Sequence, residues 1–129
     1  MTEQEMDNYL KSIGGLRHAW GKFERTIDNS KFFYVGEGWY PIIKDLIDDL
    51  IKLGWDKNIT QVKEKFGGLR FYIDEGSDEM LKLIVEAENK SYETCETCGQ
   101  KGELRKDIGW YLTLCEEHYK LKKINYERL

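Results

Sequence analysis

Residues 59–73 read ITQVKEKFGGLRFYI, two strand-like runs separated by two glycines. The pattern predicts a β-hairpin whose two loop residues are Gly67 and Gly68. Because neighbouring strand residues point to opposite sides, such a hairpin has an apolar face and a polar face. The apolar face of the predicted hairpin carries Val62, Phe66, Leu69, Phe71 and Ile73. The polar face carries Lys63, Lys65, Arg70 and Tyr72.

Two features of the predicted hairpin are unfavourable for local folding. The pairing places Lys65 directly opposite Arg70, and like charges in that position destabilise a hairpin. It also points Glu64 into the apolar face. Conflicts of this kind between a sequence and its local structure are typical of functional sites.

The polar face has two interpretations. In the first, cationic side chains and nearby aromatic rings hold a phosphate or a nucleotide. The candidate ligand-binding residues are then Lys63, Lys65, Arg70, Tyr72, Trp39 and Tyr40. In the second, the polar face is the solvated side of a sheet, its lysines protect an edge strand, and Glu64 pairs with one of them.

Helical patterns stand on both sides of the hairpin. Pro41 suits the first turn of a helix whose wide apolar face continues to Leu53 and ends at Gly54. After the hairpin, Ser77 can cap a second helix that runs towards Cys95. We therefore expect a small α+β body built from helices and a hairpin.

The N-terminal third predicts further elements. Thr2 and Glu5 form a capping box, and apolar residues at helical spacing follow until Gly14. The spacing continues beyond this glycine and predicts a second short helix. Its apolar residues are Leu16, Ala19, Trp20, Phe23 and Ile27. Residues 31–35 favour a strand, and His18 lies off the apolar stripe, so we expect it on the surface.

The three cysteines and one of the two histidines form a metal-binding pattern. Two residues separate Cys95 from Cys98, and two separate Cys115 from His118. This spacing directs four side chains at one tetrahedral Zn2+, which we expect as a structural cofactor. Four protein ligands leave no open position for a catalytic water. The alternative is a disulfide from Cys95 to Cys98 or Cys115 in an oxidising compartment.

The residues around these ligands predict a small C-terminal module. A cysteine knuckle at residues 95–99 precedes two short strands and a helix that opens at Cys115. Knuckle, hairpin and helix in this order are the plan of a treble-clef zinc module. We therefore expect two parts, an α+β body at residues 1–90 and a Cys3His zinc module at residues 91–129.

The composition is that of a folded globular protein, with 129 residues, 40% of them apolar and 34% charged. A formal charge of −4 argues against coating duplex DNA through bulk charge. Residues 1–5 are acidic and lack the features of a secretion signal, and no apolar run is long enough to cross a membrane. We therefore expect a cytoplasmic protein, in which thiols stay reduced, and no membrane partner.

Three stretches of the chain carry a resemblance. They are GEGWYP at residues 36–41, QVKEKFGGLRFY at residues 61–72, and the pattern CxxCG…LCxxH between Cys95 and His118. Together they resemble a group of small proteins encoded by bacteriophages and prophages. The resemblance leaves out residues 1–30. It implies a bacterial host cell and a zinc module, and it carries over no catalytic residues.

These observations favour a non-enzymatic protein that binds a small phosphorylated or nucleotide ligand on the hairpin. In a phage, such a protein would act in anti-defence by sequestering nucleotide signals of the host. One alternative is nucleic-acid binding through the zinc module and its last helix. That helix carries Lys120, Lys122, Lys123 and Arg128. Another alternative is a protein inhibitor that blocks a host factor with exposed aromatic residues.

An enzyme is the least favoured class. The cysteines are assigned to zinc, no serine lies in a nucleophile-elbow pattern, and residues 36–38 do not form a phosphate-binding loop. Glu37, Glu64 and His18 are candidate acid or base groups of a phosphodiesterase-like site, but the sequence does not bring them together.

Overall fold

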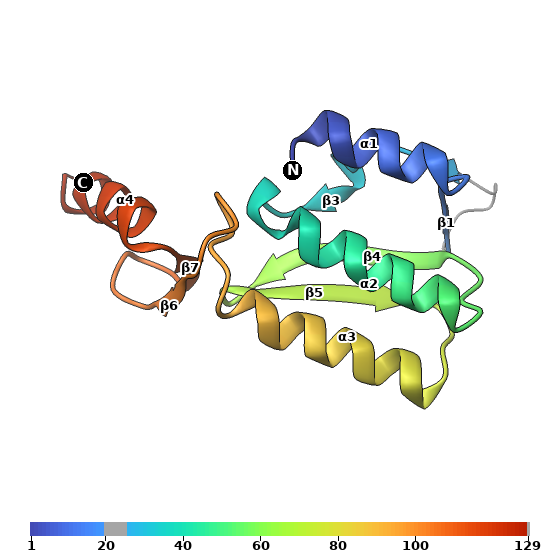
Figure 1. Cartoon of the computed structure of the whole chain (residues 1–129). Helices are drawn as coiled ribbons and strands as arrows, with labels where there is room; N and C mark the ends of the chain where they lie inside the picture. The colour runs from blue at the N-terminus through green and yellow to red at the C-terminus, as the bar shows by residue number, and fades with distance from the viewer. Residues whose placement is uncertain (20–25, 129) are drawn as a thin grey trace.

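The computed structural model describes residues 1–19 and 26–128 and has a mixed α+β architecture, as the sequence predicts (Figure 1). The helices are α1 (Glu3–Ser12), α2 (Tyr40–Lys52), α3 (Asp78–Ser91) and α4 (Glu116–Glu127), with short 3-10 turns η1 (Ser30–Phe32) and η2 (Glu37–Trp39). The strands are β1 (Leu16–His18), β2 (Thr26–Ile27), β3 (Phe33–Tyr34), β4 (Asn58–Lys65), β5 (Gly68–Ile73), β6 (Glu103–Arg105) and β7 (Leu112–Leu114). Among the described helices, none combines the length and apolarity needed to span a bilayer.

The main sheet is organised around β4, its longest strand. β5 runs antiparallel along one edge of β4, while β1 and β3 run parallel to the other edge. β2 extends the sheet by pairing antiparallel with β1. The sheet therefore joins segments from the N-terminal third to the central hairpin.

The short helix predicted over residues 16–27 is wrong at both of its ends. Residues 16–18 and 26–27 are the paired strands β1 and β2, in which Leu16 lies opposite Ile27. The apolar spacing that resembled a helix thus reflects two strands that both point apolar residues into the core. The middle of that prediction, with Trp20 and Phe23, lies outside the described residues.

The β4–β5 hairpin forms as predicted, but its turn comes one residue earlier. Lys65 pairs with Gly68, so the two loop residues are Phe66 and Gly67. Their φ values are 54° and 84°, as a two-residue primed turn requires. Gly68 is needed inside the strand instead, because a Cβ there would lie 2.8 Å from Cε1 of the Tyr92 ring.

The earlier turn changes which residues face one another, but not which side of the hairpin they occupy. Arg70 lies opposite Lys63, and not opposite Lys65 as predicted. Because Lys63 and Lys65 are two positions apart on one strand, both still point to the polar side. Phe66 is the exception to the predicted apolar face, since it sits in the turn and is 65% exposed.

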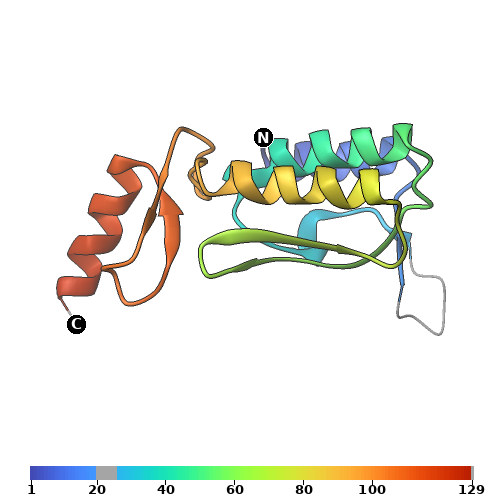
Figure 2. The same ribbon diagram turned by 90° about the horizontal axis from the view of Figure 1, so that it is seen from below.

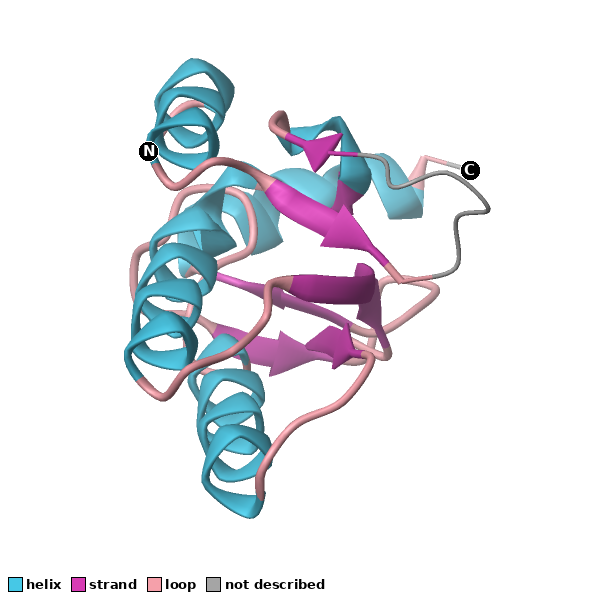
Figure 3. Cartoon of the chain, turned by 90° about the vertical axis from the view of Figure 1, so that its right-hand side faces the viewer, coloured by secondary structure: helices cyan, strands magenta, loops and turns pink. Residues whose placement is uncertain are grey.

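The described helices cover the sheet on one side. Figure 2 and Figure 3 show α1, α2 and α3 on one side of the sheet and no helix against the other side of β4 and β5. Buried apolar side chains fill the space between these helices and the sheet. They include Leu10, Ile43, Ile47, Leu50, Val62, Leu69 and Phe71.

The start of α2 is part of this core. Pro41 lies in the first turn, as predicted. Trp39 is 0% exposed and Tyr40 is 2% exposed. The prediction that these two rings stack on a ligand is therefore corrected, because the apolar stripe of α2 begins with them and buries both ring faces.

The C-terminal segment has a small apolar cluster of its own. β6 and β7 pair antiparallel, and α4 follows β7 directly. The buried residues of this apolar cluster are Cys95, Ile108, Leu114 and Cys115. Figure 1 shows this segment, in orange and red, next to the turn of the β4–β5 hairpin. The order of turn, strand pair and helix agrees with the order expected from the sequence.

Candidate functional site

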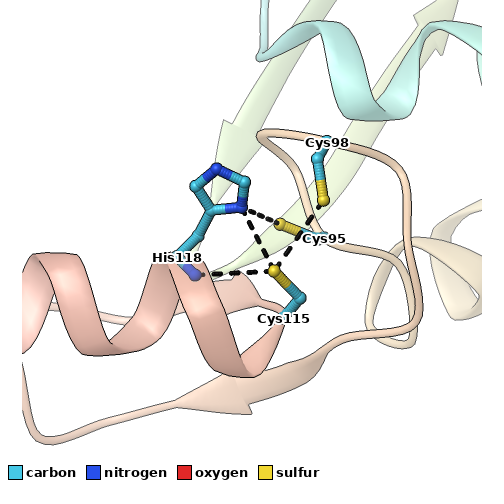
Figure 4. A group of neighbouring side chains, drawn as sticks. All are labelled: Cys95, Cys98, Cys115 and His118. Atoms are coloured by element: carbon cyan, nitrogen blue, oxygen red, sulfur yellow. Dashed lines mark hydrogen bonds between the residues drawn. The ribbon is translucent and has the colours of Figure 1, made fainter.

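The four side chains predicted as metal ligands lie together near the start of α4 (Figure 4). Cys95 and Cys98 come from a tight turn after α3, in which the Gly99 N–H donates to the Cys95 carbonyl at 2.8 Å. Cys115 is the N-cap of α4, and its sulfur accepts the backbone N–H of His118 at 3.5 Å. Local caps and turns therefore direct the four side chains to one point.

The donor atoms are close enough together to bind one metal ion. All four lie within 4.8 Å of one another. The Sγ atoms of Cys98 and Cys115 are 3.8 Å apart, and Nδ1 of His118 lies 3.1 Å from the Cys115 sulfur. A tetrahedron with metal–sulfur bonds of about 2.3 Å has sulfur–sulfur edges of about 3.8 Å. The cluster could hold a metal ion, and its cysteines are free thiols with no disulfide among them.

The surroundings of Cys95 favour a thiolate. Burial opposes ionisation of this thiol, but backbone N–H groups of Cys115, Cys98 and Thr97 outweigh it and lower the pKa of Cys95 to about 7. A thiol that ionises near neutral pH is already in the form that binds a metal. The donor set of three sulfurs and one imidazole nitrogen suits a borderline or soft ion and not Mg2+ or Ca2+.

The metal-binding turn packs directly against the segment that precedes α2. The Gly38 N–H donates to the Glu96 carbonyl at 2.8 Å, and the Gly36 N–H donates to the Glu96 carboxylate at 2.9 Å. A Cβ at Gly38 would overlap the Cys95 carbonyl, and a Cβ at Gly36 would overlap that of Glu96. Residues 36–38 therefore carry two glycines because the metal-binding turn lies against their backbone.

Two further contacts join the metal-binding segment to the body. The Trp39 indole N–H donates to the Thr94 carbonyl at 2.9 Å. The buried hydroxyl of Thr113 donates to the carbonyl of Gly67, in the hairpin turn, at 2.6 Å. A Cβ at Gly67 would overlap the Leu104 side chain. The metal site is thus tied both to the start of α2 and to the hairpin.

We call the side of the main sheet that no described helix covers the open face. By strand pairing it comprises Arg17, Thr26, Tyr34, Asn58, Gln61, Lys63, Lys65, Gly68, Arg70 and Tyr72. Four of these residues are cations and none is a carboxylate. Acidic side chains such as Asp45, Asp49 and Glu86 line the groove between α2 and α3 instead. The helical side carries lysines as well, such as Lys52 and Lys82, so it is mixed in charge, whereas the charged side chains of the open face are all cationic.

Aromatic rings lie next to cations on the open face. Tyr34 of β3 pairs with Lys63 of β4, which in turn pairs with Arg70 of β5, so the three form one row across the sheet. Tyr72 pairs with Gln61 in the adjacent row. Tyr34 is 70% exposed and Tyr72 is 43% exposed. Such a row can stack a base and pair with its phosphate.

The cations of the open face differ in their partners. Arg70 forms an ion pair with Glu88 of α3 at 2.9 Å, and its guanidinium donates to the Tyr92 hydroxyl at 3.3 Å. Burial alone would lower the pKa of Arg70, but these two partners raise it. Neither Lys63 nor Lys65 forms an ion pair with any residue that the structure describes. The predicted facing pair of Lys65 and Arg70 is therefore not assembled, and the two lysines are the available charges.

The structure places the predicted ligand-binding residues in two groups. Lys63, Lys65, Arg70 and Tyr72 share the open face, whereas Trp39 and Tyr40 lie in the core. Sequence reasoning missed Tyr34. A signal for it existed in the strand predicted at residues 31–35, because alternation would expose one neighbour of the buried Phe33.

The candidate acid and base groups lie on separate elements. Glu64 accepts the backbone N–H of Gly67 at 3.0 Å and so stabilises the hairpin turn. Glu37 belongs to η2. His18, expected on the surface, is half-buried, and its ring lies edge-on to Phe32 with the ring centroids 5.4 Å apart.

The lysines of α4 are partly neutralised. Lys123 forms an ion pair with Asp107 at 2.6 Å, and Lys120 lies 3.8 Å from Glu116. These pairings weaken the case for α4 as a surface that binds a phosphate backbone.

Comparisons of the chain with protein-family models, with curated proteins and with solved structures found no match. The resemblance to phage-encoded proteins therefore stays a prediction from the motif residues.

Proposed function

We propose that the four-ligand cluster binds Zn2+ as a structural ion within a treble-clef-like module. Three sulfurs and one imidazole nitrogen are a common structural zinc set, and the sulfur separation of 3.8 Å fits it. The first two ligands lie on a turn and the last two at the start of a helix, with an antiparallel strand pair between them. Four protein ligands complete the shell, so the ion contributes folding free energy and not catalysis.

Metal analysis of the full chain, purified without added metal, tests this assignment. We expect about one zinc ion per chain, as in other structural sites. Cys115→Ser should lose the ion and unfold the C-terminal segment. Thr97→Ser is the matched control, because Thr97 lies between Cys95 and Cys98 in the metal-binding turn and is not a ligand. A protein without stoichiometric zinc, or a Cys115→Ser variant with full zinc content, would contradict the proposal.

We also propose that the open face binds a nucleotide without changing it chemically. The row of Tyr34, Lys63 and Arg70 carries this proposal, because it combines an exposed ring with an available ammonium group. Tyr72 and Lys65 extend the same surface. An aromatic ring supplies stacking to any base, and a lysine beside it supplies a partner for phosphate.

The biological setting follows from the sequence resemblance. In the cytoplasm of a bacterium infected by a phage, a protein of this kind would sequester nucleotide signals of the host's defence. Sequestration requires only tight binding, and the candidate acid and base groups Glu37, Glu64 and His18 lie on separate elements.

Calorimetry with mononucleotides, cyclic dinucleotides and inorganic phosphate tests the open face. We expect nucleotides to bind and both Tyr34→Ala and Lys63→Ala to weaken binding by about tenfold, since one stacked base contributes about 1–3 kcal/mol. Lys52→Ala is the matched control, because Lys52 is an exposed lysine on α2, among the helices that cover the other side of the sheet. Absence of nucleotide binding, or wild-type affinity in both open-face variants, would overturn the proposal.

A further inference from the structure

Three aromatic side chains gather at the end of the open face and form what we call the aromatic cluster, Phe66, Trp110 and Tyr111. Phe66 lies in the hairpin turn, and the other two lie in the loop between β6 and β7. Phe66 is 65% exposed and Trp110 is 60% exposed. The rings of Phe66 and Tyr111 meet edge to face, with their centroids 6.5 Å apart. Phe66 and Tyr111 therefore form an apolar surface open to solvent, and the exposed Trp110 is the chain neighbour of Tyr111.

Folding alone does not account for Phe66 at this position. Its φ of 54° lies in the left-handed region, which bulky side chains avoid and which glycine or asparagine adopts more easily. The ring gains no burial in the core in return. A strained and exposed aromatic residue is more consistent with a binding role than with a structural one.

Lysines connect the aromatic cluster to the open face. Nζ of Lys65, a residue of the open face, lies 5.5 Å from the centre of the Phe66 ring. Nζ of Lys106 lies 5.5 Å from the centre of the Tyr111 ring. Three strand residues span about 10 Å from Lys63 to Phe66. The combined surface therefore extends well beyond the length of one base and its phosphate.

Two carboxylates lie within three residues of the cluster in sequence, and both have hydrogen-bond partners. Glu64 accepts the Gly67 N–H at 3.0 Å. Asp107 accepts from Lys123 at 2.6 Å and from the Tyr119 hydroxyl at 2.6 Å, both on α4. Figure 2 shows the loop between β6 and β7 beyond the hairpin turn, on the side away from α2 and α3. The cluster thus lies towards the same side of the molecule as the cations of the open face, although the whole chain carries a formal charge of −4.

We propose that the open face and the aromatic cluster together form one binding strip for single-stranded nucleic acid. The inference rests on the proposed nucleotide binding of the open face and names its ligand class. Successive unpaired bases stack on exposed rings of the strip, while Lys63, Lys65 and Lys106 lie beside the phosphates. Bases in a duplex do not offer their faces for such stacking, so the strip selects single strands.

Fluorescence anisotropy with the full, zinc-loaded chain tests the strip. The probes are labelled single strands of DNA and of RNA of about 12 nucleotides, within the site sizes of such platforms, the matching duplex, and an unlabelled mononucleotide as competitor. We expect the single strand to bind at least about tenfold more tightly than the mononucleotide, since several stacked bases contribute. A comparison of the DNA and RNA strands shows which sugar is preferred.

Variants of the cluster separate this inference from the proposed function. Phe66→Asn keeps a residue that accepts positive φ, and Trp110→Ala removes an exposed ring. Each should weaken binding of the single strand by about tenfold, with unchanged affinity for the mononucleotide. Tyr34→Ala should weaken both. Leu81→Ala, an exposed apolar change on α3, is the control and should change neither.

Different outcomes would overturn the binding strip and the proposed nucleotide binding of the open face. Equal affinity for the single strand and the mononucleotide, equal affinity for the duplex, or wild-type binding by both cluster variants would overturn the strip and leave nucleotide binding standing. Failure of every probe to bind, or wild-type binding of the mononucleotide by both Tyr34→Ala and Lys63→Ala, would overturn the proposed function and the strip together.

Discussion

Replacing Gly38 with alanine should separate the metal-binding turn from the body of the protein. The backbone of Gly38 lies against this turn, and its N–H donates to the Glu96 carbonyl at 2.8 Å. An alanine Cβ would overlap the Cys95 carbonyl and lie 2.6 Å from the carbonyl of Glu96. These neighbours are backbone atoms held by the metal ligands, so they cannot rotate away as a flexible side chain would.

The size of the effect follows from the distances. Ordinary contacts to a Cβ begin at 3.4 Å, so the turn must move by about 1 Å. That movement breaks the Gly38 N–H bond to Glu96 and strains the one from Gly36, each worth about 1 kcal/mol. With the cost of overpacking, about 1–3 kcal/mol, we expect the free energy of unfolding to fall by about 3 kcal/mol.

Urea unfolding followed by tryptophan fluorescence measures this loss, because Trp39 adjoins the altered residue. Gly54→Ala is the control. Gly54 has a φ of 90° and no atom within 4 Å of its Cβ position, so alanine there costs only backbone strain, about 1 kcal/mol. If Gly38→Ala costs no more than Gly54→Ala, the close approach of the two backbones does not determine stability and the reasoning fails.

Two other substitutions test the contacts described above, each by urea unfolding. Thr113→Val should lower the free energy of unfolding by about 1–3 kcal/mol, because it leaves the buried Gly67 carbonyl without its donor; a loss below the error of the fit would contradict this. Burial alone would raise the pKa of Asp48, but the Tyr9 hydroxyl and the Lys44 ammonium group outweigh it and lower that pKa. The stabilisation by Asp48 is therefore present above the pKa of this carboxyl in the unfolded chain, about 4. It is lost as the pH falls through the lower pKa of Asp48 in the folded protein. Asp48→Asn should lower the free energy of unfolding by at most about 1 kcal/mol at pH 7, because the partial exposure of Asp48 weakens its interactions. The difference between variant and wild type should vanish in acid. A difference that does not depend on pH would refute the ionic cause.

The elements that sequence patterns predicted correctly are those defined by local periodicity. The helix with Pro41 in its first turn and the helix capped by Ser77 both form, because their apolar stripes and caps lie within a few residues. The strands β1 and β2 were mistaken for a helix. Two or three residues are too few to show a period, and β1 is a strand because it pairs with β2 and with β4, which begins about forty residues later.

The candidate site shows the same division. The four metal ligands could be predicted because two fixed spacings encode them, and strand alternation predicted the hairpin members of the open face, Lys63, Lys65, Arg70 and Tyr72. The register of the hairpin could not be predicted from local sequence. Gly68 is needed within the strand because Tyr92, which follows the next helix, packs against it. Trp39 was misplaced for a similar reason, since its acceptor Thr94 lies 55 positions away.

The contact between residues 36–38 and the metal-binding turn limits how this chain can be recombined. If the segment after α3 were exchanged for an unrelated zinc module, the N–H groups of Gly36, Gly38 and Trp39 would lose their hydrogen-bond acceptors. A successful transplant must therefore carry the two glycines, the tryptophan and the hairpin turn along with the cysteines. The start of α2 and the C-terminal segment thus form one structural unit, which an engineer has to move as a whole.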